Sequence, residues 1–304
     1  MNIDIAHRVS TGYKVCYPHY KIAKSFAFEG IYFPSLRRYN RRFLMTNKIN
    51  NSPLLNDVTR YWNIRAESYS ESNQQELLSE KQQKWRHLLL GHVKEGETLK
   101  VLDIGTGPGF FAILLALSGH DVTAIDATEG MLQEAKQNAQ THQVNIQFIR
   151  GDVHQLPFAN EQFDLVVSRN VTWNLKAPQV AYSEWFRVLK SGGSLINFDA
   201  NWYLHLFDEA YWQGFVADRA RSIEEQVEDH YVNTDTKEME RIARQLPLSQ
   251  IKRPQWDINT LLEIGFNRYM IDTRIGDFVW NEEEKINYGS TPMFMIHAQK
   301  TTYK

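Results

Sequence analysis

The stretch from Val101 to Ala116 constrains the fold of this chain more than any other. It reads VLDIGTGPGFFAILLA: a short apolar run, three glycines spaced by two, and a second apolar run long enough for a helix. An apolar run that is broken by glycines and then resumes is typical of a buried strand, a tight turn and a helix. The stretch therefore predicts an α/β fold.

The three glycines of this turn, Gly105, Gly107 and Gly109, indicate a ligand that lies against the main chain. Without a Cβ the backbone can adopt left-handed dihedrals, and the next helix can point its amide donors at the ligand. A dinucleotide fingerprint needs a small residue at position 110, where this chain has Phe110, which argues against NAD or FAD. Asp103 would repel a pyrophosphate but can help to hold an ammonium group, so the turn favours a cationic, nucleotide-like ligand.

Two more acids follow predicted strands. Asp126 ends the apolar run 121–126 and lies 19 residues after Gly107, where an acid at the end of the second strand can accept hydrogen bonds from ribose hydroxyls. Asp126 can equally be a helix N-terminal residue that the helix dipole stabilises. Asp152 follows a third strand-like run within 145–150, and Gly151-Asp152 is also a common turn dipeptide.

The turn Asp-x-Gly-x-Gly-x-Gly from Asp103, the segment from Asp152 to Leu156-Pro157-Phe158, and Leu189-Lys-Ser-Gly-Gly193 together resemble class I S-adenosylmethionine-dependent methyltransferases. The resemblance is to the methyltransferase type 11 and ubiquinone-biosynthesis-methyltransferase-like members. It implies a Rossmann-like, doubly wound seven-stranded sheet whose last strand is antiparallel, and S-adenosyl-L-methionine as the cofactor. The resemblance rests on specific motifs over residues 55–200. Over residues 258–299 only the general order of the predicted elements resembles the family.

The resemblance also implies roles for individual residues. The glycine loop would wrap the amino-acid end of the cofactor, Asp152 would accept a hydrogen bond from the adenine amino group, and the Val153 amide and Met131 would lie near the ring. The complete set of expected cofactor contacts is Tyr61, Arg65, Tyr69, Asp103, Gly105, Thr106, Gly107, Gly109, Asp126, Ala127, Met131, Gly151, Asp152, Val153, Arg169 and Asn170.

The loop after the fourth predicted strand, 163–168, is expected to face the transferring methyl group, because ligands of open α/β sheets lie outside the carboxyl ends of the strands. The matching family position is often histidine, whereas this chain has an amide and an indole. No catalytic base is therefore predicted, and the identity of the catalytic residue stays open. The substrate-side candidates are Asn170, Trp173, Asn174, Asp199, Asn201, Tyr203 and His205.

Residues 61–69 resemble the aromatic N-terminal lid of small-molecule methyltransferases, with Tyr61, Arg65 and Tyr69 as the lid candidates. Residues 1–44 differ from the rest of the chain, because eight lysines and arginines face two acids there, a net charge of +6. This segment is expected to be a disordered extension, and translation is expected to start at Met45. A native mass that includes residues 1–44 would contradict the second expectation.

The expected domains are a basic extension at 1–44, an N-terminal helical lid at 45–95, the αβ core at 96–200, a helical cap insertion at 201–257, and a C-terminal helix with closing strands at 258–304. The net charge of −2 gives no whole-chain reason to expect nucleic acid as a partner. No apolar run approaches the ~20 residues of a membrane span, so no membrane partner is expected. Cys16 is the only cysteine, which excludes intrachain disulfides and a cysteine-built zinc site and fits the cytoplasm.

Three functions fit these observations. The first is a methyltransferase that acts on a small-molecule acceptor by in-line displacement, with no metal. The second is an RNA or protein methyltransferase that uses the basic arm, and the third is an inactive cofactor-binding sensor or interaction protein. The residues do not indicate which acceptor atom is methylated, nor the oligomeric state.

Overall fold

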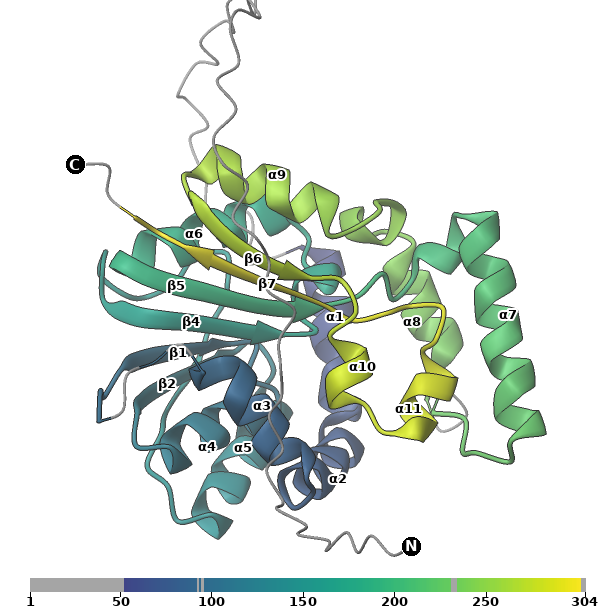
Figure 1. Cartoon of the computed structure of the whole chain (residues 1–304), viewed down its shortest axis with the longest axis horizontal. Helices are drawn as coiled ribbons and strands as arrows, with labels where there is room; N and C mark the ends of the chain where they lie inside the picture. Colours follow the sequence, from purple (N-terminus) through teal and green to yellow (C-terminus); the bar gives the residue numbers. More distant parts are fainter. Residues whose placement is uncertain (1–51, 92, 94–95, 231–233, 302–304) are drawn as a thin grey trace, which may run out of the picture. The chain divides into compact units, whose positions relative to one another are not determined.

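A seven-stranded mixed sheet with helices on both faces forms the centre of the molecule in the computed structural model, which describes residues 52–91, 93, 96–230 and 234–301 (Figure 1). The spatial order of the strands is β3-β2-β1-β4-β5-β7-β6. The strands are β1 Lys100–Ile104, β2 Asp121–Asp126, β3 Gln147–Arg150, β4 Phe163–Arg169, β5 Leu189–Asp199, β6 Arg268–Asp272 and β7 Phe294–Gln299.

The first five strands form the parallel part of the sheet. Strands β1 to β5 run parallel, and the chain order reverses direction at β1, whose neighbours are β2 and β4. Strand β7 is antiparallel to both β5 and β6. The predicted sheet with an antiparallel last strand is confirmed, and the reversal next to β1 places a ligand crevice at the carboxyl ends of β1 and β4.

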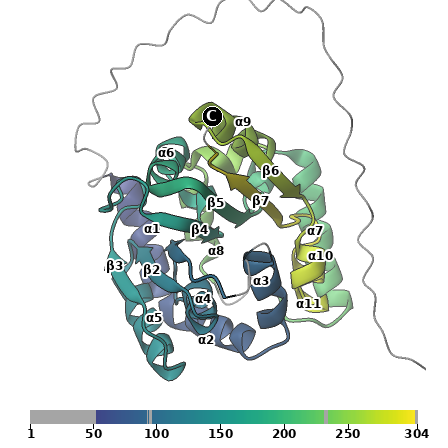
Figure 2. The same cartoon turned by 60° about the vertical axis from the view of Figure 1, so that its left-hand side comes forward.

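Two groups of helices cover the two faces of the sheet (Figures 1 and 2). On one face, buried side chains of α3, α4 and α10 pack with β1 and β5, and Trp85, Phe111 and Phe198 meet edge to face at 5.1–5.6 Å. On the other face, α6 and α9 pack around the buried side chains of Tyr182 and Trp185. The helices are α1 Pro53–Ile64, α2 Ala66–Leu77, α3 Lys81–Leu90, α4 Phe110–Leu117, α5 Glu129–Thr141, α6 Pro178–Val188, α7 Glu209–Glu224, α8 Thr236–Ala243, α9 Gln255–Ile264, α10 Gly276–Val279 and α11 Glu282–Asn287.

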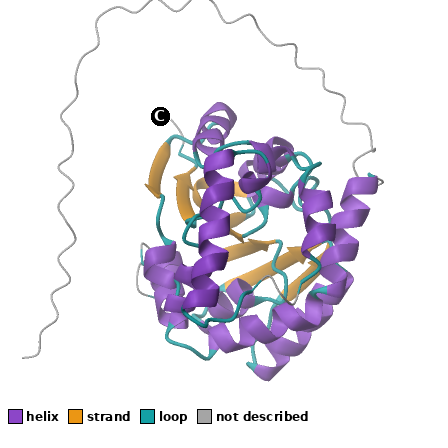
Figure 3. Ribbon diagram, turned by 90° about the vertical axis from the view of Figure 1, so that its right-hand side faces the viewer, coloured by secondary structure: helices purple, strands orange, loops and turns teal. Residues whose placement is uncertain are grey.

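The segment predicted as a helical cap contains α7 and α8 and lies beyond the carboxyl ends of the strands (Figures 1 and 3). Helix α8 packs on α1 through a third cluster of buried side chains, which includes Tyr61, Trp173 and Met239. The N-terminal and cap segments therefore meet over the crevice of the sheet. No helix among the described residues has the length and apolar character needed to cross a bilayer.

Local sequence explains where several elements begin and end. Helix α6 ends at Val188 and β5 begins directly after it at Leu189, and the pairing of β4 with β5 shifts its register between Phe163 and Leu165. Asn281 and Glu284 form a reciprocal capping box, which fixes the start of α11. The expectations for residues 1–44 and for the start at Met45 concern residues outside the described part.

Candidate active site

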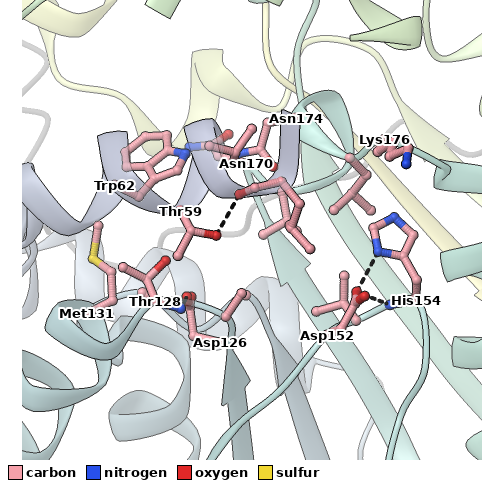
Figure 4. Close-up of a pocket in the computed structure, with 18 of the residues that line it drawn as sticks. Thr59, Trp62, Asp126, Thr128, Met131, Asp152, His154, Asn170, Asn174 and Lys176 are labelled. Carbon is pink, nitrogen blue, oxygen red and sulfur yellow. Dashed lines mark hydrogen bonds and ion pairs between the residues drawn. The ribbon is translucent and has the colours of Figure 1, made fainter. Parts of the chain in front are cut away.

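A cavity lies where the glycine turn, the ends of β2 and β4 and helix α1 come together (Figure 4). Its empty volume is about 830 Å³, which includes the open mouth. One wall is mostly apolar and comes from α1, and the opposite side is polar. The lining residues are Leu54, Leu55, Val58, Thr59, Trp62, Tyr69, Gly105, Gly107, Asp126, Ala127, Thr128, Met131, Asp152, Val153, His154, Arg169, Asn170, Val171, Asn174, Leu175 and Lys176.

The glycine turn forms the floor of the cavity. Gly105 has a φ of 62°, and a Cβ at this position would lie only 2.4 Å from a methyl group of Val171. Gly107 has a φ of 54°, and a Cβ there would meet Tyr69 and Met131 at ordinary contact distances. The Thr106 amide donates to the Ile125 carbonyl at 3.1 Å, which holds the turn against β2. Glycine at 105 is therefore required by a close approach as well as by its dihedrals.

Asp103 lies behind this turn and does not line the cavity. Its Oδ2 accepts hydrogen bonds from the Thr106 hydroxyl at 2.6 Å and from the Ala112 amide at 3.1 Å. Burial raises the pKa of Asp103 to about 7, although both hydrogen bonds act in the opposite direction. The Asp103 carboxylate therefore joins the turn to α4, and the contact with the cofactor expected of it stays a prediction.

An Asp103→Asn variant is expected to remove a pH dependence from the stability of the fold. The Asp103 carboxyl has a pKa near 7 in the folded protein and about 3.9 in the unfolded chain. Between about pH 3.9 and pH 7 the native state therefore binds more protons than the unfolded state. The free energy of unfolding of the wild-type protein falls as the pH rises through this range. Both hydrogen bonds go to one oxygen, which the asparagine amide oxygen can replace. The stability difference, variant minus wild type, should rise by on the order of 2–3 kcal/mol from pH 5 to pH 8 in urea unfolding. A difference that does not change with pH would contradict the raised pKa.

Asp126 ends β2 and does line the cavity, as Figure 4 shows. Its two oxygens accept hydrogen bonds from the Gly107 amide at 3.0 Å and from the Thr128 amide at 2.8 Å. Burial raises its pKa above the ordinary value. Asp126 therefore holds the glycine turn next to the start of α5, and its carboxylate stays at the cavity surface.

Asp152 follows β3 and is held by His154. The Asp152 Oδ1 accepts hydrogen bonds from the His154 amide at 2.9 Å and ring Nδ1 at 2.6 Å, and the ring faces the carboxylate in Figure 4. The His154 Nε2 accepts from the Ala177 amide at 3.3 Å, so the neutral ring carries its proton on Nδ1. Burial raises the pKa of Asp152, but the bonds from His154 outweigh it and the pKa is lowered overall. The Asp152 Oδ2 is buried and has no hydrogen-bond partner among the described residues.

The loop after β4 supplies the third polar part of the lining. Arg169 pairs with Glu76 of α2 at 2.8 Å, and its guanidinium lies 4.2 Å from the ring centroid of Phe110. Asn170 has a φ of 59°, in the left-handed region that is uncommon for residues other than glycine. Its carbonyl accepts a hydrogen bond from the Trp173 indole at 2.9 Å. The Asn170 Oδ1 is buried without a hydrogen-bond partner in the described part of the chain. Strained backbone and unsatisfied polar atoms of this kind are typical of ligand sites.

Comparisons with known proteins agree with this geometry. Residues 102–197 match the family model described as a methyltransferase domain. The chain carries a class I S-adenosylmethionine-dependent methyltransferase domain. It is 40% identical over 109 residues to a malonyl-[acyl-carrier protein] O-methyltransferase of Erwinia pyrifoliae, which covers 36% of this chain and 40% of that protein. It is 36% identical over 113 residues to a demethylmenaquinone methyltransferase of Renibacterium salmoninarum, covering 37% and 46%.

Solved structures share the fold of this methyltransferase domain. A Methanococcus maripaludis protein, provisionally described as an S-adenosyl-L-methionine-dependent methyltransferase, has a TM-score of 0.50 and 24% identity over 80% of this chain and 94% of its own. The Haemonchus contortus phosphoethanolamine N-methyltransferase 2 has a TM-score of 0.52 and 16% identity over 72% and 53%. The chain spans less than half the length of the two curated relatives, so the likeness concerns the domain.

Most of the residues expected to contact the cofactor line the cavity of the methyltransferase domain, and others do not. Thr106, Gly109 and Gly151 belong to the turns that shape it without being part of its lining, and Gly151 lines a neighbouring hollow. Of the lid candidates, only Tyr69 lines the cavity. Tyr61 is buried in the cluster between α1 and α8, and Arg65 lies at the junction of α1 and α2.

The substrate-side candidates after β5 lie outside the cavity. Asp199 is fully buried and accepts a hydrogen bond from Arg253 at 2.8 Å, so it is no free carboxylate for an acceptor. The Asn201 side-chain amide donates to the Arg253 carbonyl at 3.1 Å and accepts from the Arg253 amide at 2.9 Å. His205 stacks on Phe215 with ring centroids 4.3 Å apart, and burial lowers its pKa to about 4.

The aromatic candidates pack away from the cavity as well. Trp173 and Tyr203 have ring centroids 5.0 Å apart in the cluster beneath α8, whereas Asn170 and Asn174 do line the cavity. In the orientation that satisfies both neighbours, the Asn174 amide accepts from the Trp62 indole at 3.1 Å and donates to the Val171 carbonyl at 3.0 Å. Asn174 therefore links the loop after β4 to α1.

Several lining residues were missed from the sequence, among them Trp62, His154 and Lys176. His154 could have been predicted from its place two residues after Asp152, because an imidazole at that spacing can hydrogen-bond to the Asp152 carboxylate. Trp62 stood next to a lid candidate. Among the described residues, no group of three or more histidine, cysteine, aspartate or glutamate side chains is placed to hold a metal ion.

Proposed function

We propose that this protein is an S-adenosylmethionine-dependent methyltransferase that transfers a methyl group to a small-molecule acceptor. The observation that carries the proposal is the placement of Asp126 and Asp152 at the carboxyl ends of two neighbouring strands of a methyltransferase domain, around one cavity whose floor is the glycine turn. The spacing of two acids along such a cavity suits a nucleoside, with one acid for the ribose and one for the base.

The residues present fit the cofactor. The Asp152 Oδ2 lacks a donor among the described residues, and an adenine amino group would supply one. His154 fixes the carboxylate in the orientation that leaves this oxygen available. Asp126 would hold the ribose hydroxyls, with Met131 and Val153 against the ring. The turn at Gly105 and Gly107 would hold the amino-acid end, with Tyr69 above it.

When bound, the cofactor supplies a methyl group that its sulfonium already activates. The chain mainly orients the reactants, and holding donor and acceptor in line at about 3 Å can supply ~7–11 kcal/mol of the barrier. Among the described residues that line the cavity, the carboxylates are those of Asp126 and Asp152, both of which the cofactor would use. The amides of Asn170 and Asn174 are left to orient the acceptor, whose proton passes to water.

A small acceptor is favoured by the cover over the cavity. Helix α1 and the loop after β4 enclose it, and α8 packs on the outer side of α1, so a folded macromolecule has no direct approach across α1. The two curated relatives are a demethylmenaquinone methyltransferase and a malonyl-[acyl-carrier protein] O-methyltransferase, whose names indicate acceptors of very different chemistry. The relatives therefore do not indicate one acceptor, and the experiment below is designed to identify it.

The test is incubation of the purified protein with methyl-labelled S-adenosylmethionine and a size-fractionated extract of its source cells. Label in the low-mass fraction is expected, and mass spectrometry of that fraction would then identify the acceptor. Label in RNA or protein would overturn the small-molecule assignment. Cofactor binding by calorimetry without transfer to any fraction would overturn the assignment as an active enzyme.

A further inference from the structure

A fully buried ion cluster lies directly behind the loop that follows β4. At its centre is the guanidinium of Arg253, which precedes α9 and has no exposed surface. It donates to Asp199 Oδ2 at 2.8 Å, to the Thr172 hydroxyl at 2.5 Å, and to both oxygens of Asp257 at 2.7 and 2.9 Å. Burial of a charged side chain lowers the stability of the fold unless its hydrogen-bonding atoms have partners. Asp199, Thr172 and Asp257 are the partners of the Arg253 guanidinium.

Asp199 extends the cluster to two loops at the carboxyl edge of the sheet. Its Oδ2 accepts from the Thr172 hydroxyl and, at 2.9 Å, from the Trp173 amide, both in the loop after β4. Its Oδ1 accepts from the Ala200 amide at 2.9 Å and from the Trp202 indole at 3.1 Å, both in the loop after β5. One carboxylate therefore fixes the two loops relative to each other.

The cluster reaches the cavity through Trp173. The Trp173 amide is held by Asp199, and its indole donates to the carbonyl of Asn170 at 2.9 Å. Asn170 lines the cavity with a left-handed φ of 59° and a side-chain oxygen that has no partner among the described residues. A strained residue of this kind keeps its conformation only where its surroundings hold it. On this side the surroundings are a series of hydrogen bonds: Arg253 donates to Asp199, the Trp173 amide donates to Asp199, and the Trp173 indole donates to the Asn170 carbonyl.

We infer that Arg253 is a positioning residue of the methyl-transfer site, which acts through Asp199, Thr172 and Trp173 to hold Asn170 against the acceptor. The inference rests on the proposed function. Arg253 and Asp199 do not line the cavity, so they touch neither reactant and their effect is on the geometry of the loop. Asp126 and Asp152 lie on β2 and after β3, outside this cluster, so cofactor affinity should depend on the cluster much less than transfer does.

The experiment compares Thr172→Val with Thr172→Ser. Valine has the shape of threonine but loses the hydroxyl that Asp199 and Arg253 share, whereas serine keeps it. Thr260→Val is the matched control, because Thr260 is also buried but lies in α9 outside the cluster. Each full-length variant is assayed for label transfer at saturating cofactor, for S-adenosylhomocysteine binding by calorimetry, and for hydrogen exchange of the peptide that covers 170–175.

Thr172→Val is expected to lower the transfer rate at least about tenfold, because small misplacements of a reacting geometry cost that much, and to change cofactor affinity less than about threefold. Exchange should rise in 170–175 and stay unchanged elsewhere. Thr172→Ser should restore most of the transfer rate. Arg253→Lys, which cannot bond Asp199, Thr172 and both oxygens of Asp257 in the same planar arrangement, should behave like Thr172→Val.

Two results would overturn the inference. Transfer and exchange in Thr172→Val that equal those of wild type would show that the cluster does not hold the loop. Equal losses of transfer and cofactor affinity in the valine and serine variants would show that the cluster serves only general stability. If the wild-type protein transfers no label, the proposed function fails by itself, and exchange in 170–175 still decides whether the cluster fixes the loop.

Discussion

Replacement of Gly105 by alanine is expected to lower the free energy of unfolding by about 2–5 kcal/mol and to abolish cofactor binding. Two costs combine. An alanine at a φ of 62° costs roughly 1–2 kcal/mol for the left-handed backbone. Its Cβ would also lie 2.4 Å from one methyl group of Val171 and 2.9 Å from the other, and overpacking of a close contact typically costs about 1–3 kcal/mol. Any shift of Val171 or of the turn changes the floor of the cavity, since both line it.

Gly192→Ala separates these two costs. Gly192 also has a positive φ, 84°, but a Cβ there would have no atom within 4 Å. It lies in β5 far from the lining of the cavity, so this variant should lose only the backbone contribution and bind the cofactor normally. Chemical denaturation of both variants, together with calorimetric titration of S-adenosylhomocysteine, is the measurement. Equal stability and normal binding of Gly105→Ala would contradict the close approach of the turn and Val171.

The part of the site that could be predicted from sequence is the part that depends on local chain geometry. Glycines at 105 and 107 and acids at 126 and 152 each follow a strand within a few residues, so strand and turn together fix where their atoms point. Parallel strands then bring their carboxyl ends to one edge, which places Asp126 and Asp152 around the same cavity. The parallel part of the sheet follows from the same alternation of strands and helices.

The part that could not be predicted depends on partners distant in the chain. Asp199 ends a strand as Asp126 does, and nothing local distinguishes the two acids. What separates them is Arg253, 54 residues later, which meets Asp199 only once the cap segment has folded over the sheet. His205 is likewise removed from the site by Phe215, which stacks on its ring from the next helix.

Asp103 shows a different limit, because its hydrogen-bond partners could not be predicted from its place at the end of a strand. The strand ends at Ile104, and the Asp103 carboxylate accepts from the Thr106 hydroxyl and from the Ala112 amide near the start of α4. The first amides of a helix have no partner within the helix, so a nearby buried carboxylate can accept from them. The cofactor contact expected of Asp103 stays a prediction.

Asp126→Ala is expected to weaken cofactor binding at least about tenfold, which corresponds to ~1.4 kcal/mol. The variant would remove the acceptor proposed for the ribose hydroxyls, and it would also leave the Gly107 and Thr128 amides without the carboxylate that now accepts from them. Both effects act on the ligand, because Gly107 and Thr128 line the cavity. Asp121→Ala is the matched control, since Asp121 is the exposed first residue of the same strand. Its affinity for S-adenosylhomocysteine should equal that of wild type.

A double-mutant cycle with a ligand that lacks the ribose hydroxyls isolates the proposed contact. A 2′,3′-dideoxy analogue of S-adenosylhomocysteine should bind the wild-type protein more weakly than the natural compound does, and its further loss on binding Asp126→Ala should be smaller than the loss of the natural compound. If Asp126 serves only to hold the Gly107 and Thr128 amides, the two losses should add instead, because hydroxyls and carboxylate would then act independently. Additive losses, or an affinity that calorimetry finds unchanged in Asp126→Ala, would remove the ribose assignment and leave Asp126 as a residue that shapes the turn.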